Sequence, residues 1–229
     1  MTSDSQPAFD ALAAGFDLWA QTFGVERFEP FLVGLPDHAR SVLDAGCGTG
    51  ILAVHVADHV ARVVGMDISR AMLAVATRRR AEAQKTNVEF VVGDLGSIPF
   101  GDGSFDCVIS SAALYNTRLE VSLPELRRVV RPGGRIIIAD LVQRRPWLDR
   151  LPAWALLRAL AAAPGHAATF GVRTMLRVLW FRTSGGWVRH YVRPKLTPAE
   201  FCQAYSRYLP GCRIEARRWD MCVFWEDAR

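Results

Sequence analysis

Short apolar runs alternate with longer amphipathic stretches through the middle of the chain. The longer stretches, residues 51–59, 69–85 and 122–130, have helical spacing. The apolar runs predict five strands, at residues 41–44, 62–66, 88–92, 105–110 and 135–139. Because several runs are apolar at consecutive positions, both faces of these strands should be buried, as in a parallel sheet between two helical layers. The pattern predicts an α/β fold, a three-layer α/β/α sandwich.

Both ends of the chain and one long insert depart from this alternation. In the first 40 residues, apolar side chains recur at spacings of three and four, which predicts a helical lid; they are Phe9, Leu12, Phe16, Trp19 and Phe23. The insert at residues 141–196 is rich in Arg, Trp and Ala and is predicted to be an α-helical cap. The expected division is a lid at 1–40, a core at 41–140, the cap at 141–196, and at 197–229 a helix with an antiparallel strand pair (213–219 and 221–225).

A glycine-rich loop joins the first predicted strand to the helix after it. Residues 42–50 read Val-Leu-Asp-Ala-Gly-Cys-Gly-Thr-Gly. Glycines at alternate positions let the backbone turn tightly and approach a ligand, because no Cβ intervenes. The pattern is GxGxG rather than GxGxxG, and no Lys-Ser/Thr pair follows, so it is not a nucleoside triphosphate loop.

Two further carboxylates stand where a bound nucleoside would need them. Asp67 ends the second strand, where it can accept both ribose hydroxyls, and Asp94 follows the third strand, placed for an adenine amino group. Residues 132–134, Pro-Gly-Gly, lead into the fifth strand. Together with the glycine loop, these elements appear in the order that resembles class I S-adenosylmethionine (SAM)-dependent methyltransferases.

The resemblance covers about residues 8–140. Residues 105–116 and 126–134 are similar to the ubiquinone/menaquinone-biosynthesis type and its relatives in secondary metabolism. The resemblance implies a Rossmann-like, mostly parallel sheet of seven strands in the order 3-2-1-4-5-7-6, with SAM as the cofactor.

The resemblance also implies roles for particular residues. The methionine part of SAM would lie against Asp44, Gly46, Cys47 and Gly48. Asp67 would hold the ribose, Ile68 would pack on the adenine face, and Asp94 and Leu95 would meet the adenine edge. Ser110 and Ser111 would lie beneath the sulfonium.

A sulfonium methyl group is already electrophilic, so the enzyme must mainly hold a nucleophile at about 3–3.5 Å and exclude water. A hydroxyl acceptor must also lose its proton, whereas carbon or nitrogen can be methylated without a dedicated base. We expect His190 and Tyr115 to be the catalytic side chains; Asp140, His166 and Tyr191 are further candidates. No metal is expected, because the five cysteines include no CxxC pair and read as reduced thiols.

The positive charge is concentrated in the predicted cap. The chain carries +5, but residues 141–196 hold ten basic residues and one acidic residue, a net +9 that leaves −4 elsewhere. Three interpretations stay open: arginines solvated outside a packed cap, a cap that attracts an anionic group of an apolar acceptor, or an interfacial helix on anionic lipid. Nucleic acid is not expected, because no recognised binding module is present and no Asn/Asp-Pro-Pro-Tyr follows the fourth strand.

The first residues have neither a basic start nor an apolar core, so no secretory signal is expected, and no stretch is long enough to span a bilayer. We therefore expect a cytoplasmic protein, with peripheral membrane contact through 141–196 as an option and the oligomeric state open. The expected function is SAM-dependent methylation of a small, largely apolar acceptor, such as a quinone-like, lipid or secondary-metabolite molecule. The alternatives are a SAM-binding enzyme that transfers no methyl group, such as a cyclase, and a SAM-binding protein of the membrane interface.

Overall fold

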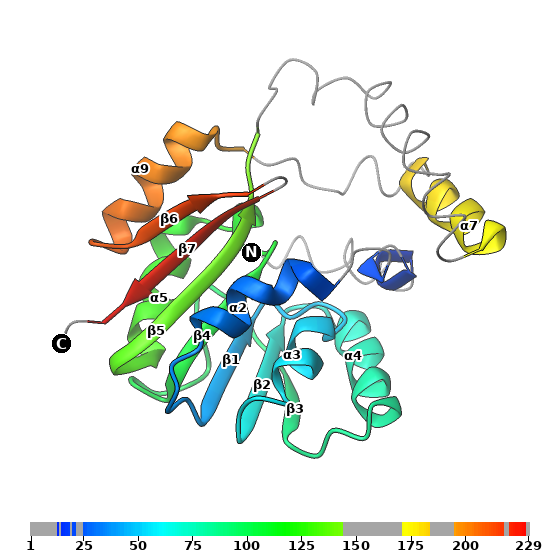
Figure 1. Cartoon of the computed structure of the whole chain (residues 1–229), viewed down its shortest axis with the longest axis horizontal. Coiled ribbons are helices and arrows are strands. Elements are labelled where there is room, and N and C mark those ends of the chain that lie inside the picture. The colour runs from blue at the N-terminus through cyan, green and yellow to red at the C-terminus, as the bar shows by residue number, and fades with distance from the viewer. Residues whose placement is uncertain are drawn as a thin grey trace.

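The computed structural model describes residues 13, 15–18, 20–21, 25–143, 171–183, 195–217 and 220–227 (Figure 1). Its centre is a seven-stranded sheet in the order β3-β2-β1-β4-β5-β7-β6, as the resemblance implied. The first five strands pair in parallel, and β7 pairs antiparallel with β5 and β6. The strands are β1 (Ser41–Ala45), β2 (Arg62–Asp67), β3 (Val88–Val92), β4 (Phe105–Ser111), β5 (Val130–Leu141), β6 (Arg213–Ala216) and β7 (Asp220–Glu226).

Helices cover both faces of this sheet, which confirms the three-layer sandwich. Phe31 and Leu52 belong to the apolar cluster on one face, and Leu126 and Phe201 to the cluster on the other. Figure 1 shows α2 and α3 in front of the sheet and α5 behind it. The helices are η2 (Val25–Phe28), α2 (Glu29–Gly34), α3 (Ile51–Val56), α4 (Arg70–Glu82), η3 (Leu114–Asn116), α5 (Leu119–Val129), α7 (Val172–Thr183) and α9 (Pro198–Tyr208).

Strand β5 begins five residues before its predicted start. Val130 pairs with Phe105, and after a register shift Arg135 pairs with Cys107. The predicted Pro-Gly-Gly turn therefore lies inside the strand as an irregularity. A Cβ on Gly134 would stand 2.7 Å from the Asp106 carbonyl oxygen, which explains why the chain needs glycine at this crossing.

The predicted lid and cap fall partly outside the described residues. Within the first 40 residues, helical structure is described at 15–18, in η2 and in α2. Within 141–196, α7 is the described helix, and His190 lies outside the described residues. The division of the chain into lid, core, cap and C-terminal part stays a prediction.

A buried carboxylate fastens the start of β1 to β4. Asp106 Oδ2 accepts the N–H of Arg40 at 2.6 Å and that of Ser41 at 2.9 Å, while Oδ1 forms an ion pair with Arg131. Burial opposes ionisation of Asp106, but these hydrogen bonds and the Arg131 charge outweigh it and hold the pKa of the carboxyl below its usual value.

We predict that Asp106→Asn lowers the free energy of unfolding by about 1–3 kcal/mol, because two part-buried backbone N–H groups and Arg131 lose a charged partner. The folded-state pKa is depressed, so this contribution is present at neutral pH and is lost as the pH falls through the folded-state value, below about 4. Urea unfolding at two pH values measures it. The control is Asp102→Asn, whose side chain is 82% exposed beside Arg128 and should cost less than about 1 kcal/mol. Equal losses in the two variants would contradict the prediction.

Candidate functional site

The glycine loop folds tightly against the turn that follows β4. Gly46 has a φ of +80°, and a Cβ there would stand 2.4 Å from the Cβ of Ala113. Gly50, the residue before α3, has a φ of +74° and lies similarly close to Ala76 of α4. Any larger residue at these two positions would meet both strain and a clash. The loop is therefore held between α4 and the turn after β4.

The N–H groups of this loop are already used inside the protein. Gly46 and Cys47 both donate to the Met66 carbonyl oxygen, at 2.8 and 3.0 Å, and Gly48 donates to Asp67 Oδ2 at 2.9 Å. A phosphate-binding loop needs such N–H groups for the ligand. This loop is left with carbonyl oxygens and a nearby carboxylate, which suit a cation.

That carboxylate is Asp44 at the end of β1. Asp44 is 1% exposed, and its Oδ2 has no hydrogen-bond partner among the described residues. Burial raises its pKa to about 8, with a further rise from the charge of Asp67, while the Ala53 N–H lowers it. A buried, unpaired carboxylate oxygen is costly, so this atom is a ready partner for an ammonium group.

Asp67 at the end of β2 holds the loop in place. Its Oδ1 accepts the Ser69 N–H at 2.9 Å, and its Oδ2 accepts the Gly48 N–H. Ser69 in turn caps α4 by accepting the Met72 N–H at 3.1 Å. Carboxylate oxygens have further lone pairs, so Asp67 can still accept hydroxyl groups of a ribose.

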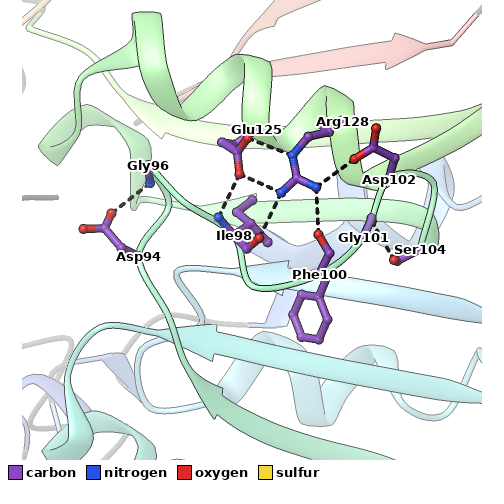
Figure 2. Close-up of polar contacts among 9 residues, drawn as sticks. All are labelled: Asp94, Gly96, Ile98, Phe100, Gly101, Asp102, Ser104, Glu125 and Arg128. Atoms are coloured by element: carbon purple, nitrogen blue, oxygen red, sulfur yellow. Dashed lines mark hydrogen bonds and ion pairs between the residues drawn. The ribbon is translucent and has the colours of Figure 1, made fainter.

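The segment after β3 carries Asp94 and Leu95 and is fixed by an arginine of α5. Figure 2 shows the Arg128 guanidinium donating to the carbonyl oxygens of Ile98 and Phe100, at 2.9 and 2.7 Å, and to Glu125. Glu125 Oε2 also accepts the Ile98 N–H at 2.8 Å. Sequence reasoning missed Arg128, although the spacing of Glu125 and Arg128 on one helix could have signalled an ion pair.

Asp94 Oδ1 accepts the Gly96 N–H at 2.8 Å, so this carboxylate shapes its own turn (Figure 2). Leu95 is buried, with its side chain within 3.5 Å of the position that a Cβ on Gly46 would take. The structure thus places Leu95 beside the glycine loop, and Ile68 follows Asp67 at the end of β2, half-buried. The predicted nucleoside residues lie at the carboxyl ends of β2 and β3, beside the glycine loop that follows β1.

The two serines that end β4 differ. Ser110 is fully buried and donates to the Ala45 carbonyl oxygen at 2.8 Å, so it braces the end of β1. Ser111 is half-buried. The next residue, Ala112, has a φ of +52°, which is strained for a residue with a Cβ and is a conformation often found at functional sites.

Arg79 of α4 is a further residue that sequence reasoning missed. It donates to the Thr49 carbonyl oxygen of the glycine loop at 3.0 Å and forms an ion pair with Asp17 of the N-terminal segment. Phe16 lies over the same loop, 3.7 Å from the position of a Cβ on Gly48. No short-range pattern links Arg79 and Asp17, because 62 positions separate them.

A cavity of about 470 Å³ lies beside the carboxyl end of β5. It is bordered by the turn after β4, the start of α5, and α9, and Tyr115 and Asp140 line it. Tyr115 is half-buried in η3. His190, the other predicted catalytic residue, lies outside the described residues. Among the described residues, no cluster of side chains could hold a metal ion.

Comparisons with known proteins show which family has this fold and sequence. A family described as "Methyltransferase domain" matches residues 43–138. The demethylmenaquinone methyltransferase of Thermobifida fusca is 34% identical over 161 residues, 67% of this chain and 68% of that protein. The chain belongs to the SAM-dependent methyltransferase family.

Two further comparisons show how far the similarity to known proteins extends. The demethylmenaquinone methyltransferase of Beutenbergia cavernae is 40% identical over 120 residues, which cover 52% of this chain but 45% of that protein. A SAM-dependent methyltransferase from Aquifex aeolicus shares the fold, with a TM-score of 0.59 at 18% identity over 93% of this chain and 98% of that one. The chain thus spans less than half the length of the Beutenbergia relative.

The site residues fit the cofactor of the family. The unpaired Asp44 oxygen suits the ammonium group of SAM, and a loop with no N–H to spare at 46–48 suits a cation rather than a phosphate. With the ammonium group at Asp44, Asp67 would hold the ribose and the Asp94–Leu95 segment would meet the adenine. These assignments of individual residues are proposals.

We predict that SAM binding expels a proton from Asp44. The free carboxyl has a pKa of about 8 and must ionise to pair with the ammonium group, so affinity should rise between about pH 6 and 7.5, by up to tenfold per unit. Isothermal titration calorimetry in two buffers of different ionisation enthalpy measures both the affinity and the released proton.

Asp44→Asn should bind SAM more weakly and with little pH dependence. The matched control is Asp94→Asn, which should weaken binding but keep the pH slope. A full slope in Asp44→Asn would assign the proton to another group.

Proposed function

We propose that this protein transfers the methyl group of SAM to a small, largely apolar, quinone-like acceptor. The observation that carries this proposal is the glycine loop: its N–H groups are used internally while a buried carboxylate oxygen beside it has no partner among the described residues. Relatives named demethylmenaquinone methyltransferases support the acceptor class.

The protein's part in this reaction is positioning. Bound SAM supplies an electrophilic methyl group. Asp44 would hold the ammonium group of its methionine part and Asp67 its ribose, from neighbouring strands, and the turn after β4 lies against the glycine loop. The acceptor then needs only in-line placement and the exclusion of water.

The proton of a hydroxyl acceptor needs a group to receive it. Tyr115 lines the cavity beside β5, which supports its predicted role near the acceptor. His190 stays a prediction from the sequence. Methyl transfer by a His190→Ala protein tests it, and an unchanged turnover would remove this histidine from the reaction.

The function is tested by production of S-adenosylhomocysteine (SAH) with a panel of acceptors: a reduced demethylated naphthoquinol, its oxidised quinone, a simple phenol and no acceptor. We expect acceptor-dependent SAH formation with the reduced naphthoquinol, lowered at least tenfold in Asp44→Asn at limiting SAM. Mass spectrometry of the product gives the methylated atom. SAM binding without SAH from any acceptor would contradict methyl transfer and favour a non-methylating SAM-dependent activity.

We further propose that α7 contacts an anionic membrane surface. Val172, Leu176 and Trp180 are 60%, 54% and 73% exposed and recur every four residues, so they share one face, and Arg173 and Arg177 adjoin it. An exposed apolar stripe beside arginines suits an anionic lipid interface. Among the described residues, no helix has the length and apolar character to span a bilayer.

We predict that phosphatidylglycerol vesicles co-sediment this protein at low salt and that Leu176→Asp reduces the bound fraction severalfold. The matched control is Val33→Asp on α2, which alters a valine that is 77% exposed but lies away from α7. Absence of binding at low ionic strength would eliminate the membrane contact. Equal losses in both variants would make it a nonspecific charge effect.

A further inference from the structure

The cavity beside β5 combines an apolar wall with a polar end. Leu114, Leu119, Leu196 and Phe201 contribute apolar surface, and its volume of about 470 Å³ is ample for a bicyclic aromatic ring. Four charged side chains also line the cavity. They are Glu120 on α5, Lys195 just before α9, and Glu200 and Arg207 on α9. Asp140 and Tyr205 form its buried polar end, each 1% exposed.

Asp140 joins three elements at this end. From the end of β5, its Oδ2 accepts the Tyr205 hydroxyl of α9 at 2.8 Å, and its Oδ1 accepts the Leu141 N–H at 3.1 Å. The carboxylate also accepts the N–H of Tyr115 in η3. Tyr205 itself is fixed by stacking on Phe201, with ring centroids 4.0 Å apart. These contacts hold the carboxylate in place, and Asp140 is among the buried residues that line the cavity.

This end of the cavity adjoins the cofactor site through one short turn. Ala113 touches the glycine loop at Gly46, and two residues later Tyr115 donates to Asp140. Ser111, predicted to lie beneath the sulfonium, pairs with Ala139, the residue before Asp140. The turn after β4 therefore has one side on the glycine loop and the other on the cavity.

We propose that this cavity is the acceptor pocket and that Asp140, positioned by Tyr205, receives the proton of an acceptor hydroxyl group. The inference rests on the proposed methyl transfer and narrows its acceptor to a hydroxylated, apolar aromatic ring. Asp140 takes the role for which the sequence favoured His190.

The proton balance is simple. The acceptor hydroxyl gives its proton to the Asp140 carboxylate, and the acceptor oxygen, or a ring carbon activated by it, forms the bond to the methyl group. The methyl–sulfur bond breaks, and its electron pair stays on sulfur as SAH forms. If carbon is methylated, that carbon loses its hydrogen as a proton and the oxygen regains one. Either route releases one proton in total.

The ionisation of Asp140 suits this task. Burial raises its pKa to about 7, the hydrogen bonds from Tyr205, Leu141 and Tyr115 lower it, and the charge of Asp220 on β7 raises it. A base with a pKa near the working pH is the most effective. Burial and the neighbouring Asp140 raise the pKa of Tyr205, so the phenol stays a donor.

The first test is the pH dependence of kcat/KM with a reduced naphthoquinol. The wild-type value should rise through about pH 7, as the base ionises. Asp140→Asn should lose at least tenfold in kcat and lose this ionisation, with its SAM affinity retained. Tyr205→Phe removes a hydrogen bond that lowers the Asp140 pKa, so its profile should shift to higher pH, which a merely structural role would not produce.

An active wild type whose profile is unchanged in Asp140→Asn overturns the role of Asp140. Loss of the same ionisation in His190→Ala, with Asp140→Asn unaffected, returns the role to the histidine. If Asp140→Asn does not fold, Tyr205→Phe decides, and an unshifted profile in that variant overturns the proposal.

A binding experiment separates the pocket from the reaction. Calorimetry with 1,4-dihydroxynaphthalene in the presence of SAH should show binding to the wild type and at least tenfold weaker binding to Ala204→Trp, which fills the cavity. Ser206→Trp, on the same helix but not lining the cavity, should stay within twofold. Equal affinities in the two variants overturn the pocket. A wild type that makes no SAH overturns the proposed function and the proton transfer, and the calorimetry then decides the pocket alone.

Discussion

Two carboxylates, Asp44 and Asp67, are buried at the carboxyl ends of neighbouring strands, and the rest of the site depends on how their charges are satisfied. Asp67 is satisfied from within, by the N–H groups of Gly48 and Ser69. Asp44 has an oxygen with no partner among the described residues, and burial together with the charge of Asp67 raises its pKa. Asp67 thus fixes the loop, whereas Asp44 has an oxygen that can accept the proposed ammonium group.

The hydrogen bonds inside the glycine loop explain how its glycines are used. Because its N–H groups point back at Met66 and Asp67, the glycines serve close packing rather than anion binding. Gly46 allows Ala113 to approach, so the turn after β4 can lie directly against the loop. The strained backbone of Ala112 is the local cost of bringing this turn between the cofactor loop and the cavity.

The parallel strands of the central sheet could be predicted from the sequence, because buried parallel strands have an apolar signature and glycine and aspartate residues follow several of them. The start of β5 could not, since it depends on Val130 pairing across a register shift with Phe105. The cofactor residues were predicted from the resemblance to SAM-dependent methyltransferases, and their individual roles stay predictions. Asp140 and Tyr205 could not be paired in advance, because 65 positions separate them and only the packing of α9 on the sheet brings them together.

Asp44 and Asp140 affect the pH dependence of the protein's stability in the same direction. Both have a folded-state pKa above the ordinary value, so the folded state holds protons that the unfolded chain releases. Each therefore lowers stability as the pH rises from about 4 toward its own folded-state value. Asp106 has the opposite sign, because its pKa is depressed, and it sits at the far end of β4 from the site. Asp106 thus stabilises the fold at the amino ends of the central strands. At the carboxyl ends, ionisation of Asp44 and Asp140 is unfavourable in the free protein, and a bound cation beside either carboxylate would make it less so.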